Sequence, residues 1–163
     1  EIHAQFEKFH ATGLPLDHVN GHLHLHLHPI IFNILMQDAD ALRIRHLRLT
    51  RDCFARSRRM AQGRWFYRAS HAGIYEWLSG RVRAPLRHRN IRHAQITFGL
   101  LQDSQVNEDY VLKLLPQLPP GDSELYAHPS LDRFKHEFDA LISPRVKARV
   151  QELGIELIRY QDL

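Results

Sequence analysis

Cysteine is almost absent from this sequence, and so are the long apolar runs that mark membrane proteins. Cys53 stands alone, so an intramolecular disulfide framework is excluded and a reducing compartment is favoured. No apolar run approaches the ~20 residues that span a bilayer; the longest, residues 30–36, is broken by Asn33. We expect no signal peptide, and the sequence opens on Glu1 instead of methionine. We therefore expect a cytoplasmic chain that is part of a longer protein.

Acidic residues are scarce in one long stretch of the chain. Residues 43–92 hold fourteen arginines but only Asp52 and Glu76, although the whole chain has a net charge of only +4. Such a stretch suits nucleic acid, an anionic membrane surface or an anionic substrate. No zinc-finger spacing, RNA-binding signature or heptad zipper accompanies it, so we expect no nucleic-acid partner. Two interpretations stay open: solvated faces of an arginine-rich chain, or contact with a membrane surface that makes the protein peripheral to the inner membrane.

The pattern of apolar and helix-breaking residues predicts alternating helices and strands within one domain of 163 residues. Asn107 and Ser143 are expected to cap helices at their N-termini, and Gly13 and Gly154 to end them. Helices are predicted at 1–12, 30–37, 74–86, 108–118 and 144–153, and strands at 18–28, 41–49, 93–100, 123–128 and 155–160. Residues 51–73 are interpreted as a lid or an extended loop. Five strands separated by helices favour a parallel α/β sheet or barrel.

Histidine and leucine alternate through residues 18–29, the most distinctive segment of the chain. A strand has a side-chain period of two, so this segment as a strand would place its imidazoles on one face and its leucines on the other. The leucine face suits the buried outer side of a parallel strand, and neutral imidazole is a common metal ligand. A structural polar face is the alternative. The imidazole face would comprise His18, His22, His24, His26 and His28.

A second candidate position is His128, which precedes Pro129 directly after a short apolar strand. In barrels of parallel strands the chemistry lies at the C-terminal ends of the strands. This rule would bring His128 to one rim together with the end of the 18–28 strand and with Arg48 and Thr50. A histidine that only caps the strand is the equally weighted alternative.

The stretch from His18 to Pro29, H-V-N-G-H-L-H-L-H-L-H-P, resembles the signature T-H-x-D-S-H-x-H-x-H-x-x-P of the YdjC-like carbohydrate deacetylases. The likeness is greatest to the branch associated with hopanoid biosynthesis. Further similar segments are 1–16, 97–99, 124–129, 140–144 and 160–163. The resemblance thus runs from end to end of the chain and is weakest over 51–92.

This resemblance implies an irregular TIM-like (β/α) barrel with parallel strands and a metal-dependent enzyme. The reaction would remove the N-acetyl group from an acetylated amino sugar, in this branch on a glycosylated hopanoid lipid. A divalent ion, Mg or Zn, would be held by His22 together with an aspartate and a histidine of the family's first half. His128 would be the general acid, and substrate binding or the orientation of His22 would fall to His18, His24, His26 and Arg48.

The sequence departs from the family pattern at two points. Asn20 stands where many members have aspartate, and the aspartate pair and histidine of the family's first half are missing; Asp38 and Asp40 do not replace them. We therefore expect residues 1–163 to be a single-domain C-terminal fragment with an arginine-rich insertion or lid at 51–92. Alone it should be inactive and should pair with the missing N-terminal portion or as a homodimer.

Two alternatives to a deacetylase stay open. One is a metal-dependent phosphoesterase on a related barrel, although such enzymes add carboxylates that are scarce here. The other is a non-catalytic module that binds metal or an anionic surface. Release of free amine from N-acetylglucosaminyl substrates would separate the deacetylase from both.

Overall fold

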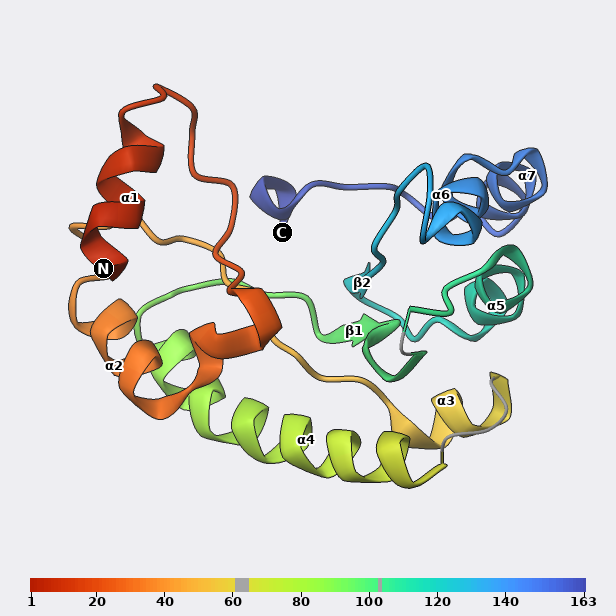
Figure 1. Cartoon of the computed structure of the whole chain (residues 1–163), viewed down its shortest axis with the longest axis horizontal. Helices are drawn as coiled ribbons and strands as arrows, with labels where there is room; N and C mark the ends of the chain where they lie inside the picture. The colour runs from red at the N-terminus through yellow and green to blue at the C-terminus, as the bar shows by residue number, and fades with distance from the viewer. Residues whose placement is uncertain (61–64, 103) are drawn as a thin grey trace. The chain divides into compact units, whose positions relative to one another are not determined.

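The computed structural model describes residues 1–60, 65–102 and 104–163, and the chain divides into two compact units (Figure 1). Unit 1 comprises Glu1–Leu49, Trp77–Ala94 and Arg159–Leu163, and unit 2 comprises Thr50–Glu76 and Gln95–Ile158. Each unit has its own cluster of buried apolar side chains. The two predicted candidate regions fall in different units, since the histidine segment belongs to unit 1 and His128 to unit 2.

Unit 1 is built from helices around buried leucine, isoleucine and phenylalanine side chains. Pro29 occupies the first turn of α2, where its fixed φ suits a helix start and its missing N–H is not needed. The chain at residues 44–49 is irregular, but Ile44, Leu47 and Leu49 are fully buried and anchor it in the core. The elements of this unit are α1 (Ile2–His10), the 3₁₀ helix η1 (His22–Leu27), α2 (Pro29–Gln37), the C-terminal half of α4 (Trp65–His88) and the 3₁₀ helix η4 (Tyr160–Asp162).

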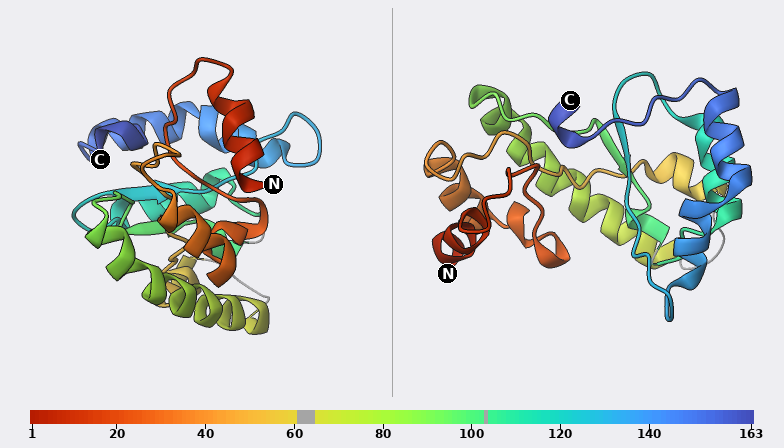
Figure 2. Two further views of the ribbon diagram at one scale, coloured as in Figure 1. Left: turned by 90° about the vertical axis from the view of Figure 1, so that its left-hand side faces the viewer. Right: turned by 90° about the horizontal axis from the view of Figure 1, so that it is seen from above.

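Unit 2 combines a short parallel sheet with a group of helices, among which α5 packs against α6 and α7 (Figure 2). Strands β1 (Ile96–Phe98) and β2 (Ser123–Leu125) pair in parallel. Gly99 has a φ of +96°, and a Cβ there would lie 2.2 Å from the Tyr126 carbonyl oxygen, so only glycine fits beside the sheet. The helices are α3 (Phe54–Met60), the first half of α4, η2 (Leu100–Gln102), α5 (Glu108–Leu114), η3 (Leu115–Gln117), α6 (Lys135–Ile142) and α7 (Pro144–Glu152).

The helices predicted at 1–12, 30–37, 108–118 and 144–153 are confirmed with small shifts of their ends, and the helix predicted at 74–86 is part of the longer α4. Asn107 caps α5 by accepting the Tyr110 N–H, and Ser143 caps α7 by accepting two backbone N–H groups. Gly13 and Gly154 adopt positive φ values of 74° and 63° after the helices they end. These signals are local side-chain and backbone properties, which a sequence displays directly.

The predicted strand at 18–28 is wrong, because most of this segment forms η1 and only Val19 makes an isolated parallel bridge. Leu23 and His24 have φ values of 49° and 60°, a left-handed backbone that no regular strand contains. The alternation of residue types therefore does not separate two faces. Leu23 is 77% exposed, whereas His26 is 2% exposed.

The other predicted strands are shortened or replaced. Those at 93–100 and 123–128 shrink to the three-residue β1 and β2, since Gly99 turns the chain away after β1. Residues 41–49 contribute only isolated bridges, and 155–160 run as irregular chain into η4. The interpretation of 51–73 as an extended loop is wrong for residues 54–60 and 65–73, which lie in α3 and α4. Residues 51–53 are irregular, and 61–64 lie outside the described residues.

The fold class is mixed α/β with a parallel sheet, as predicted, but the described residues contain one named sheet of two strands. A TIM-like barrel is not seen in them. Across residues 1–60, 65–102 and 104–163, no helix is both long enough and apolar enough to cross a membrane.

Candidate functional site

The buried histidine of unit 1, His26, ties the histidine segment to the neighbouring chain through both nitrogens of its ring. Nδ1 accepts the Gly21 N–H at 2.9 Å, and Nε2 lies 2.8 Å from the Arg48 carbonyl oxygen, to which it donates. A Cβ at Gly21 would lie 2.8 Å from the His26 backbone nitrogen, so this close turn requires glycine. The ring is therefore neutral with its proton on Nε2, because a carbonyl can only accept.

Burial lowers the pKa of His26 to about 4, and the hydrogen bond to the Arg48 carbonyl opposes this shift only in part. The charges of His24 and Arg48 lower the pKa further. Both ring nitrogens are committed to backbone groups, so in this arrangement neither can bind a metal ion or a substrate hydroxyl. His26 instead holds the segment that carries His22 and His24.

The remaining histidines of the segment do not share one face. His22 and His28 are exposed, whereas His24 is partly buried, its ring centroid 6.3 Å from that of His26. His18 stacks on Tyr160 at a centroid distance of 4.0 Å, and its Nδ1 lies 3.0 Å from Asp17 Oδ2. The predicted common imidazole face is therefore not formed.

These side chains do not complete a metal site by themselves. Across the described part of the chain, no three His, Cys, Asp or Glu side chains come together in a way that could hold a metal ion. His22 is accessible and offers one imidazole, but a protein zinc centre takes at least three protein ligands. The described donor set alone therefore does not fit a divalent ion.

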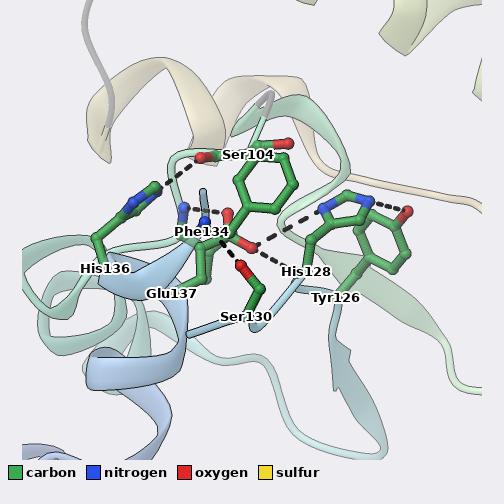
Figure 3. Close-up of polar contacts among 8 residues, drawn as sticks. Ser104, Tyr126, His128, Ser130, Phe134, His136 and Glu137 are labelled. Atoms are coloured by element: carbon green, nitrogen blue, oxygen red, sulfur yellow. Dashed lines mark hydrogen bonds and ion pairs between the residues drawn. The ribbon is translucent and has the colours of Figure 1, made fainter. Parts of the chain in front are cut away.

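The second candidate site lies in unit 2 around His128, just after β2 (Figure 3). His128 Nε2 lies 2.7 Å from the Tyr126 hydroxyl, and Nδ1 lies 3.9 Å from Glu137 Oε2. The His128 side chain is 43% exposed, whereas Glu137 is completely buried. The imidazole thus has one edge toward a buried carboxylate and another toward a phenol, and it stays accessible to a substrate.

Local structure on both sides of His128 fixes its position. The Tyr126 N–H donates to the Phe98 carbonyl at 2.8 Å and extends the pairing beyond β2. After His128 the chain turns at Ser130, whose hydroxyl accepts the Phe134 N–H at 2.9 Å and leads into α6. The Phe134 ring then lies 5.7 Å from the His128 ring, centroid to centroid (Figure 3).

Sequence reasoning missed Glu137 and Tyr126. Glu137 lies three residues before Ala140 on α6, and both are completely buried, so they share the inward face of that helix. A carboxylate among the buried positions of an amphipathic helix is the signal that could have found it. Tyr126 lies two residues before His128, which places the two side chains on the same side of extended chain.

A further buried carboxylate of unit 2, Asp52, has a structural role. Its Oδ2 accepts the Leu101 N–H at 3.1 Å within η2. Burial raises the pKa of the Asp52 carboxyl to about 6, although hydrogen bonds from backbone N–H groups oppose the shift.

His22 and Arg48 belong to unit 1 and His128 to unit 2, so their meeting at one rim stays a prediction.

Comparison with known proteins gives a family match along almost the whole chain. A family model described as YdjC-like protein matches residues 1–152. A carbohydrate deacetylase of Brevibacillus brevis is 41% identical over 44 residues, which are 27% of this chain and 18% of that relative. The match therefore spans less than a fifth of the relative's length. No solved structure matches the chain.

Proposed function

This chain belongs to the YdjC-like family, and we propose that it is part of a hydrolase that removes the N-acetyl group from an acetylated amino sugar. The carbohydrate deacetylase of Brevibacillus brevis, similar over 44 residues, supports this substrate class. The structural observation that carries the proposal is the accessible His128 imidazole between Tyr126 and the buried Glu137 carboxylate.

Hydrolysis of an acetamide needs a proton donor for the departing amine. Water gives one proton to a base as its oxygen adds to the acetyl carbon. The C–N bond then breaks and its electron pair takes a proton from an acid, so that a neutral amine leaves together with acetic acid, which ionises to acetate. Histidine suits this step because it exchanges protons near neutral pH. We assign the donor role to His128, acting from the Nε2 edge that faces Tyr126.

We also propose a divalent metal ion, Mg or Zn, with His22 as one of its ligands. When bound, such an ion would polarise the acetyl carbonyl and acidify the attacking water. The described side chains do not complete its coordination. The proposal therefore requires ligands from an N-terminal portion of the protein beyond these residues, and it predicts that residues 1–163 alone bind metal weakly and pair with that portion or with a second copy.

A glycolipid substrate, such as a glycosylated hopanoid, is the finer form of this proposal. Its support is the C-terminal half of α4, where Trp77 is 58% exposed and the Arg81 guanidinium carbon lies 5.0 Å from the centre of the Trp77 ring. Arg87 and His88 add basic groups in the last turn. An exposed tryptophan beside cationic side chains suits the interface of an anionic membrane, so we propose a protein peripheral to such a membrane.

The test of the reaction class is a substrate comparison with the intact protein. Purified protein should release free amine and acetate from N-acetylglucosaminyl substrates and should leave phosphate monoesters intact. Phosphate release without amine release would instead favour the phosphoesterase. If neither product were released, the protein would have only a binding role.

A further inference from the structure

Glu137 is a buried carboxylate whose contacts converge on one histidine. Its Oε1 accepts the Val106 N–H at 3.0 Å. Its Oε2 accepts the backbone N–H of His128 and also lies 3.9 Å from Nδ1 of the same residue (Figure 3). Burying a carboxylate is costly unless hydrogen bonds and opposite charge compensate it. Its two backbone N–H donors meet part of this cost, and its approach to the His128 ring indicates a role beyond the structural one of Asp52.

We propose that Glu137 is a positioning residue that holds His128 with its ring proton on Nδ1, and that the Tyr126 hydroxyl links Nε2 to the substrate. This inference deepens the proposed deacetylase and rests on it for the identity of the substrate. The relay runs from the buried carboxylate through the imidazole to the accessible phenol, which is the order in which the three side chains contact one another.

The Nδ1–H tautomer follows from the chemistry of the two neighbours. An ionised carboxylate only accepts hydrogen bonds and attracts the positive end of an N–H group, so Glu137 favours a proton on Nδ1. A phenol can donate or accept, so Tyr126 tolerates Nε2 in either state. The Phe134 ring, whose centroid lies 5.7 Å from that of the imidazole, is uncharged. Neutral imidazole free in water prefers the opposite tautomer, with its proton on Nε2, so the proposal departs from the default.

The relay transfers one proton from the His128 imidazolium to the amine, and Tyr126 is a phenol before and after the step. In the protonated state, His128 Nε2–H donates to the Tyr126 oxygen. As the C–N bond breaks, the Tyr126 O–H proton moves to the amine nitrogen and the Nε2 proton replaces it on the phenol oxygen. The imidazole is left neutral with its remaining proton on Nδ1 toward Glu137. Tyrosine regains its proton in the same step, so no phenolate accumulates.

The first test observes the tautomer directly. Protein labelled with ¹⁵N-histidine gives long-range ¹H–¹⁵N spectra in which the His128 ring is identified by through-bond connection to its own backbone amide. At a pH at which the His128 ring is neutral, wild-type protein should show the Nδ1–H pattern. The Nε2–H pattern in wild type would overturn the proposal, whether or not any variant folds.

Variants then separate the charge of Glu137 from its structural role. Glu137→Gln should move the His128 ring toward the Nε2–H pattern. Asp139→Asn, which removes an exposed carboxylate of the same helix paired with Lys135 at 2.7 Å, should leave it unchanged. A Glu137→Gln spectrum identical to wild type would show that the carboxylate does not select the tautomer.

The second test measures turnover in the intact protein. Tyr126→Phe and Glu137→Gln should each lower kcat roughly 10–100-fold with KM within about twofold, as residues that support a reacting group typically do. Ala140→Gly, which weakens the same helix without touching the relay, should leave kcat unchanged. Wild-type kcat in Tyr126→Phe would overturn the relay. Absence of amine release by wild type would refute the proposed function instead, while the tautomer measurement still decides the positioning role.

Discussion

At the residue scale, His22 and His26 belong to the same alternating histidine–leucine pattern but lie in different environments. His26 is buried with both nitrogens bonded to backbone groups, whereas His22 is exposed. The sequence could predict that this segment matters, but not which imidazole turns inward, because that choice depends on the left-handed backbone at Leu23 and His24. The same limit applies to Glu137, whose partners lie on other elements.

Stability should depend on pH through His26. Its pKa is about 4 in the folded protein against an ordinary value of 6.5, so between these values the unfolded chain binds a proton that the folded chain does not. The contribution of His26 to the free energy of unfolding should therefore fall by roughly 3 kcal/mol as pH drops through this window. Asp52 acts in the opposite direction, because its pKa is raised to about 6.

Comparison with His26→Gln isolates the histidine contribution from that of Asp52. The difference in the free energy of unfolding between wild type and variant is measured by urea unfolding at pH values from 7 to 4. It should shrink by roughly 3 kcal/mol as the pH falls. An NMR titration of the His26 ring provides an independent check. A midpoint near 6.5, or a stability difference that does not change with pH, would contradict the buried neutral ring.

Metal binding should depend on His22 and much less on His28, although both are exposed. In the intact protein, His22→Ala should abolish bound metal and activity if His22 is a ligand. His28→Ala is the matched control, since it removes an exposed imidazole of the same segment next to the start of α2. Metal content measured by elemental analysis decides the matter, and equal retention in both variants would remove His22 from the coordination of the ion.

At the scale of elements, five helices could be predicted from sequence, whereas of the five predicted strands two are retained in the described residues, shortened to β1 and β2. Caps such as Asn107 and Ser143 are local signals, and both are confirmed by hydrogen bonds. Strands depend on pairing with distant segments, so an apolar stretch such as 155–160 reads as a strand although it pairs with none in the described residues. Helix α6, which carries Glu137, was not predicted at all.

The exposed face of the C-terminal half of α4, which carries Trp77 and Arg81, should bind anionic lipid surfaces. Arg81→Ala should weaken binding to phosphatidylglycerol vesicles about fivefold, because a basic side chain near such a surface contributes about 1 kcal/mol. Trp77→Ala should weaken binding as well, through loss of the interfacial ring. Leu131→Ala, at a side chain that is 76% exposed in unit 2, is the control and should have no effect. Co-sedimentation measures all four proteins; equal binding to neutral vesicles would contradict the proposal.

At the scale of the whole molecule, the sequence predicted the mixed α/β class and the family, and the match over residues 1–152 confirms the family. It could not predict the extent of the sheet, which in the described residues is limited to β1 and β2. Of the candidate site, His128 was identified from its place after an apolar segment. Its contacts with Tyr126 and with Glu137 on α6 could be identified only from the folded structure.

The most direct test of the account measures amine release from N-acetylglucosaminyl substrate by the intact protein and by its His128→Asn variant. We predict that wild type releases amine. The variant should lose roughly 10²–10⁴-fold in rate, the usual contribution of a general acid, while its metal content and thermal unfolding stay unchanged. Full turnover in a folded His128→Asn protein, or no release of amine by wild type, would contradict the account.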